Sequence, residues 1–154
     1  MCLALSFTAV ATQSLHSLPP VLGQVSLCMF DDFIEFCPLE TVTPYLPTLL
    51  PLLVNNLRDP DASIRQVAVY GVGAFAVKGE KLFPSCGAAE EMINACIQAI
   101  TQLNQVTSGN TKPEKALLRV ADNACSSLFK VIEHQPQCVV RVFSICVVWF
   151  FLTR

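Results

Sequence analysis

Three carboxylates lie close together in the stretch CMFDDFIEFC and could take part in chemistry. In a helix, Asp31 and Glu35 are i,i+4 neighbours and Asp32 and Glu35 are i,i+3 neighbours, so all three share one face. Such a face attracts the Lys and Arg side chains of a basic polypeptide, although a solvated acidic surface without a ligand fits the pattern as well. A catalytic carboxylate pair is not expected, because nothing nearby indicates a substrate pocket.

A second candidate pair is Asp122 with Asn123. A carboxylate acceptor beside an amide suits the backbone of an extended peptide, and solvation of a helix surface explains the pair equally well. With the acidic trio, these two residues complete the predicted polypeptide-binding set.

No pattern in the chain points to catalysis. His134 and Cys138 have an HxxxC spacing, but a zinc site needs three or four ligands, and no other His or paired Cys accompanies them. The phosphate-binding patterns GxxxxGK[ST] and GxGxxG are absent. We therefore predict no catalytic residue, no cofactor and no metal, and the chain is not expected to be an enzyme.

The composition favours a protein that meets other proteins. Of the 154 residues, 53% are hydrophobic and 14% charged, which is more apolar than usual. The net charge of −2 gives no basic footprint for phosphates, so direct binding of nucleic acid is not expected. The eight cysteines form no CxxC pair, and we interpret them as reduced core residues.

The two ends differ from the middle of the chain. Segment 1–19 is apolar but lacks the basic start of a signal peptide, and its role is uncertain. Segment 138–154 is apolar, contains Arg141 and falls short of the roughly 20 apolar residues of a membrane span, so we expect a truncated buried helix or an aberrant chain end. These ends leave a secreted or membrane-attached helical protein as an alternative. Residues 20–137 form the predicted folded domain.

Helical periodicity runs through that domain without sustained strand alternation, so the predicted class is all-α. Asp59 and Pro60 are predicted as the N-cap and first residue of a central helix, Pro51 as a bend, and 102–112 as a flexible insertion. Thr111 has capping-box spacing to Glu114. The expected helices cover 21–37, 44–57, 61–78, 88–106 and 113–134.

The helices repeat. The apolar series Ile64, Ala68, Val72 and Phe75 recurs as Leu117, Ala121, Cys125 and Leu128, 53 residues further on, and as Leu22, Ser26, Phe30 and Phe33, 42 residues earlier. Another apolar helix separates each such helix from the next. Helix pairs that recur every 40 to 50 residues are typical of an α-solenoid, and we predict about three helical hairpins.

One stretch resembles a HEAT repeat: PTLLPLLVNNLRDPDASIRQVAVYGVGAF. Asp59 matches the turn of the motif, and Ile64 with Arg65 matches the pair that opens its second helix. Four segments also follow one another as in the importin-β-like nuclear transport receptors (karyopherin-β), in the branch that carries ribosomal proteins and histones. The segments are CMFDDFIEFC, TPYLPTLLPLL, SIRQVAVYGVGAFAVKG and RVADNACSSLFKVI.

The resemblance implies a binding module for nuclear protein import, in the cytoplasm and the nucleus. The second helix of each pair would grip basic cargo such as ribosomal proteins or histones, and the first helices would touch Phe-Gly nucleoporins. The cargo-binding set is then Asp31, Asp32, Glu35, Asp122 and Asn123, whereas Asp59, Ile64 and Arg65 are structural repeat residues.

Two departures from that family matter. Its N-terminal repeats, which supply much of the binding to the GTPase Ran, are absent, so Ran binding is expected of the full-length family rather than of this chain. Because such receptors are several times longer, we expect a fragment from the C-terminal part of one or a truncated gene product. The alternative is a HEAT-repeat scaffold in another protein assembly, since a fold does not fix a function.

Overall fold

The structure is a computed structural model that describes residues 20–108, 112–140 and 143, with side chains from Gln24 onward. Helices and short 3-10 turns account for all its regular structure, and the described residues contain no strand. The elements are α2 (Pro20–Phe36), α3 (Leu39–Val42), η2 (Thr43–Tyr45), α4 (Leu46–Asn56), α5 (Ala62–Lys78), α6 (Leu82–Ser85), α7 (Ala89–Ser108), α8 (Lys115–His134) and η3 (Pro136–Cys138).

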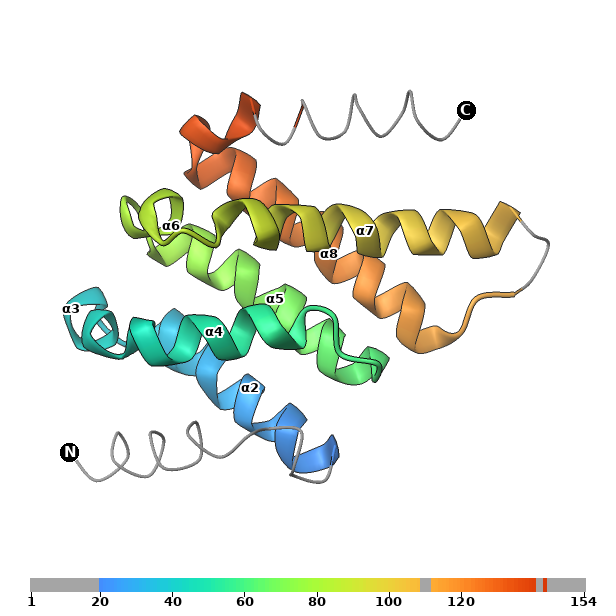
Figure 1. Cartoon of the computed structure of the whole chain (residues 1–154), viewed down its shortest axis with the longest axis horizontal. Helices are drawn as coiled ribbons and strands as arrows, with labels where there is room; N and C mark the ends of the chain where they lie inside the picture. Colours follow the sequence, from blue (N-terminus) through green and yellow to red (C-terminus); the bar gives the residue numbers. More distant parts are fainter. Residues whose placement is uncertain (1–19, 109–111, 141–142, 144–154) are drawn as a thin grey trace.

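The helices form two layers. α2, α5 and α8 run side by side in one layer, with α5 in the middle, and α4 and α7 lie across them in the other (Figure 1). α4 pairs with α5, and α7 pairs with α8. This arrangement confirms the predicted all-α solenoid of a few helical hairpins. α2, α5 and α8 correspond to the predicted second helices at 21–37, 61–78 and 113–134.

α5 is buried on nearly every side because neighbours cover it from both directions of the stack. Its apolar side chains join those of α4 and α7 in one continuous core. Gly73 lets α8 approach closely, since a Cβ atom there would lie 2.7 Å from Ser127 Oγ and 3.1 Å from Ser127 Cα. A larger residue at this position would separate the two helices.

Hydrogen bonds fix the register between α5 and the last hairpin. Two side chains of α8 and one side chain directly after it donate hydrogen bonds to backbone carbonyls of α5. Two of these three residues are buried. The bonds run from Asn123 Nδ2 to Gln66 O (3.0 Å), from Ser127 Oγ to Val69 O (2.7 Å) and from Gln135 Nε2 to Ala76 O (2.7 Å).

The helix starts differ from the prediction. Asp61, not Asp59, caps α5, because its Oδ1 accepts a hydrogen bond from Ser63 N at 2.7 Å. Asp59 lies in the turn before the helix, where its Oδ1 accepts a hydrogen bond from Asp61 N at 2.8 Å. The acid-proline turn therefore precedes α5 and is not its first turn. α8 begins after Glu114, whose side chain makes no cap bond, and Thr111 lies outside the described residues.

Two other predictions about the helices are wrong. Pro44 does not start the outer helix but lies in the 3-10 turn η2, and α4 begins at Leu46. Pro51 lies inside α4, as predicted for a proline within this helix. Residues 102–108 are not a flexible insertion but continue α7, because Leu103 and Val106 keep its helical spacing and stay partly buried.

The predicted end segments lie largely outside the residues that the structure describes. Residues 1–19 are outside it, and of 138–154 only residues 138–140 and 143 are inside. Among the helices that are described, none has the length and apolar character needed to span a bilayer. The six described cysteines are all free thiols, and two of them, Cys96 and Cys138, are buried.

Candidate functional site

A line of contacts crosses the layer of α2, α5 and α8. Tyr70 Oη donates a hydrogen bond to Glu35 Oε2 at 2.9 Å, and Lys130 Nζ lies 5.0 Å from the centroid of the Tyr70 ring. The Tyr70 side chain points away from α4 and α7. It is two residues from the buried core residue Val72, which is about 200° around the axis of α5. We call the surface carrying Asp32, Glu35, Tyr70 and Lys130 the three-helix face.

The acidic trio of α2 divides between this face and the interior. Asp32 and Glu35 are exposed, whereas Asp31 is only 4% exposed and lies between α2 and α5. The prediction of three surface carboxylates is therefore corrected for Asp31. The reason is Gly71, because a Cβ atom there would collide with Asp31 Oδ1 and lie 2.8 Å from Leu53 Cδ1.

Burial changes the acidity of Asp31. Its Oδ1 atom is buried without a hydrogen-bond partner. Desolvation, helped by the charges of Asp32 and Glu35 and opposed by Lys130, raises the pKa of this carboxyl from 3.8 to about 8. Asp31 is therefore mostly protonated at neutral pH, and Asp32 and Glu35 carry the negative charge of the three-helix face.

The second predicted pair has a different environment. Asp122 is exposed on α8, but Asn123 is half-buried and uses its amide nitrogen in the register bond to Gln66 O. α2 and α8 lie on opposite sides of α5 (Figure 1). In the repeat, Asp122 of α8 takes the position that Val69 has in α5, and Val69 is buried in the core. The structure thus does not bring Asp122 beside the acidic residues of α2.

The predicted repeat residues meet at the turn between α4 and α5. Ile64 is 8% exposed and belongs to the core. Arg65 Nη1 donates to Asp59 O at 2.7 Å and to Pro60 O at 2.9 Å, so the guanidinium holds the turn closed. An exposed ion pair between Arg58 and Glu91, 3.1 Å long, links this turn to α7.

Sequence reasoning missed Tyr70 and Lys130. Tyr70 is 35 residues from Glu35, so no local spacing relates them, and only a phenol in an otherwise apolar helix could have drawn attention to it. No group of three or more His, Cys, Asp and Glu side chains in the described part of the chain could hold a metal ion. The side chains of the three-helix face can bind by charge, hydrogen bonding and aromatic contact.

Comparison with known proteins agrees with the fold. Residues 49–78, which cover most of α4 and all of α5, match the HEAT repeat. A stretch of 112 residues, 72% of this chain, is 27% identical to "Probable importin-5 homolog" of Dictyostelium discoideum and covers 10% of that protein. No solved structure matches. Residues 49–78 thus match one HEAT repeat within an all-α solenoid, and the chain spans about a tenth of the length of this relative.

Proposed function

We propose that this chain is a binding segment of an importin-β-like nuclear transport receptor. It would work by non-covalent recognition, without catalysis, in the cytoplasm and the nucleus. The observation that carries the proposal is the similarity over 112 residues to a protein described as an importin homologue. The chemistry of the three-helix face is compatible with it, and the ligand would be a basic cargo segment such as a tail of a ribosomal protein or histone.

The contacts suggest how a basic side chain would bind. Glu35 Oε2 already accepts from Tyr70 Oη, which orients the carboxylate and leaves Oε1 to accept from an incoming ammonium or guanidinium group. The exposed Asp32 carboxylate, one turn away, can receive a second cation. Because exposed ion pairs contribute only about 0 to 1 kcal/mol each, binding needs several such contacts and weakens with salt.

Basic polypeptide is better supported as a ligand than Phe-Gly nucleoporin. In the described residues, none of the exposed large hydrophobic side chains belongs to the outer helices α4 and α7, which would meet Phe-Gly sequences. Those on the described helices lie mostly on α2 and α8, with Phe36 74% and Phe129 64% exposed. Binding of Phe-Gly sequences to the outer helices would therefore require partly buried side chains of α4 or α7 to become exposed.

The test is a titration of the chain with a labelled Lys- and Arg-rich peptide, followed by fluorescence anisotropy at low and physiological salt. Replacing both charges of the three-helix face, in Asp32→Asn with Glu35→Gln, is expected to weaken binding about tenfold. The matched control is Glu40→Gln with Glu90→Gln, which removes two exposed charges from other helices and should leave the affinity within about twofold.

A second arm uses a Phe-Gly repeat peptide under the same conditions. If the folded chain retains neither peptide at low salt, the transport proposal fails and a scaffold in another assembly becomes the better explanation. If the control pair weakens binding of the basic peptide as much as the double substitution on α2, the three-helix face is not the site.

A further inference from the structure

A pocket lies on a different part of the molecule, between the α4–α5 turn and the hairpin of α7 and α8. Its volume is about 330 Å³, and its walls come from the turn, from α7 and from Val120 of α8. Apolar atoms of Ala95, Ala99 and Val120 line one part, and the carboxamides of Gln98 and Gln102 line another. This size is at the lower end of the range for ligand pockets and suits one or two side chains.

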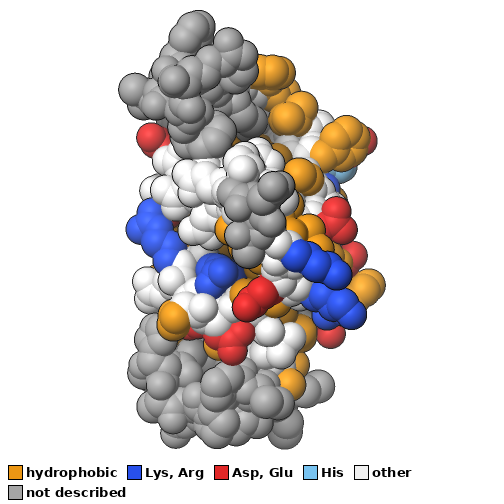
Figure 2. All heavy atoms as spheres, turned by 90° about the vertical axis from the view of Figure 1, so that its right-hand side faces the viewer, with side chains coloured by type: hydrophobic (Ala, Val, Ile, Leu, Met, Phe, Trp, Pro, Cys, Tyr) orange, Lys and Arg blue, Asp and Glu red, His pale blue; other side chains and the backbone are white. Residues whose placement is uncertain are grey.

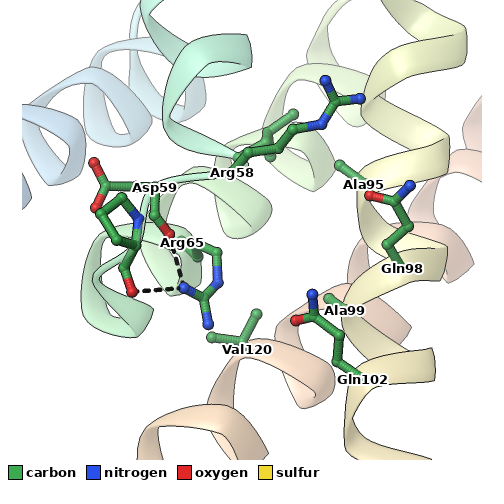
Figure 3. A pocket seen from close by; sticks show the side chains of 10 residues that line it. Arg58, Asp59, Arg65, Ala95, Gln98, Ala99, Gln102 and Val120 are labelled. Carbon is green, nitrogen blue, oxygen red and sulfur yellow. Dashed lines mark hydrogen bonds between the residues drawn. The ribbon is translucent and has the colours of Figure 1, made fainter.

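Arg65 presents an unused edge to this pocket. Its Nη1 atom is engaged by the carbonyls of Asp59 and Pro60, while Nε and Nη2 have no partner among the described residues. In Figure 3 these two nitrogens face the side of the pocket formed by Gln102 and Val120, and the Asp59 carboxylate points away. The Nε and Nη2 edge of a guanidinium matches the two oxygens of one carboxylate.

The turn before α8 differs in charge from the turn before α5. α5 starts at Ala62 and α8 starts at Lys115, and each follows a proline and an acidic residue. In this register Lys112 occupies the position before α8 that Asp59 has in the α4–α5 turn. A lysine thus replaces the acidic residue at the corresponding position of the next turn.

The surroundings favour an anion. Lys112, Lys115 and Arg119 are exposed near the start of α8, whereas Arg58 of the turn is already paired with Glu91. Figure 2, which views the molecule from this side, shows Lys and Arg side chains around the ends of the hairpins, with Asp and Glu side chains beside some of them. This face is therefore unlike the three-helix face, where the exposed carboxylates are on α2.

We propose that this pocket receives an acidic side chain of a partner polypeptide. One carboxylate binds side-on to Nε and Nη2 of Arg65, and the carboxamides of Gln98 and Gln102 donate to it. Apolar atoms of the neighbouring partner residue pack on Ala95, Ala99 and Val120. The ligand has the opposite charge to the basic cargo proposed above and binds elsewhere, so the two proposals stand or fall separately.

The test uses the whole chain and a fluorescein-labelled peptide containing Leu-Glu-Glu-Leu, compared with its Leu-Gln-Gln-Leu counterpart. Arg65 itself is a poor target because its Nη1 atom holds the turn. Gln102→Glu is better, since it places a carboxylate of the chain itself in the pocket. Gln105→Glu is the matched control, because it adds the same charge to an exposed position of α7 that does not line the pocket.

We expect the Glu peptide to bind and to shift the NMR signal of the Arg65 Nε–H group. Gln102→Glu should weaken this binding about tenfold or more, and Gln105→Glu by less than about twofold. The proposal is overturned if the Gln peptide binds as well as the Glu peptide, or if both variants bind alike. Binding of a single-stranded oligonucleotide without binding of the Glu peptide would also overturn it, since phosphate would then be the ligand.

Discussion

The buried carboxyl of Asp31 makes the stability of the fold depend on pH. Its pKa is raised from 3.8 to about 8, so between these values the folded chain binds more protons than the unfolded chain. The free energy of unfolding falls with rising pH wherever the folded state binds the extra proton. The contribution of Asp31 to stability is thus fully present below about pH 4 and is lost as the pH approaches 8.

The size of the effect follows from the two pKa values. Each pH unit over which one extra proton stays bound changes the free energy of unfolding by about 1.4 kcal/mol. Between pH 5 and pH 7 the folded carboxyl remains mostly protonated and the unfolded one mostly ionised. The loss attributable to Asp31 over this interval is therefore about 2 to 3 kcal/mol, a large part of the stability of a domain.

Urea unfolding at pH 5, 6 and 7, with Asp31→Asn beside the wild type, measures this contribution. The amide cannot ionise, so the variant should gain about 2 to 3 kcal/mol relative to the wild type as the pH rises from 5 to 7, whatever its packing cost. Asp122→Asn is the control, because that carboxylate is exposed on α8. Parallel curves for wild type and Asp31→Asn would refute the assignment of a buried, protonated acid.

Further predictions concern packing and reactivity. Gly71→Ala should lower the free energy of unfolding by about 1 to 3 kcal/mol through overpacking against Asp31, and a double-mutant cycle with Asp31→Ala should recover most of the loss. Gln135→Ala should cost about 1 to 3 kcal/mol in urea unfolding, because a carbonyl in the last turn of α5 loses its side-chain donor. Burial raises the pKa of the Cys96 thiol to about 12, so peptide mapping after brief alkylation should find Cys125 modified in the native chain and Cys96 only after unfolding.

The repeat made the fold accessible from sequence. The recurrence of the series beginning at Ile64 and at Leu117 fixed which helices lie side by side, because a hairpin with two apolar faces must stack on others. Cap positions were less accessible. Asp59 and Asp61 both suit an N-cap, and only the geometry of the turn decides that the second accepts from the helix.

The candidate site was less predictable because helical spacing does not say where a neighbouring helix packs. Asp31 and Glu35 share a face, yet a 40° difference around the helix axis buries the first against Gly71 and leaves the second exposed. Likewise, Asn123 has the composition of a binding residue and instead donates to a carbonyl of α5. The contacts of Tyr70 depend on three helices and have no local signature.

The most direct test of binding at the three-helix face is an amide NMR titration of the isotope-labelled chain with the basic peptide at low salt. The proposal predicts saturable shifts at Asp32, Glu35 and Tyr70, with little change in α4 and α7. Shifts confined to α4 and α7, or an unchanged spectrum at high peptide concentration, would contradict it.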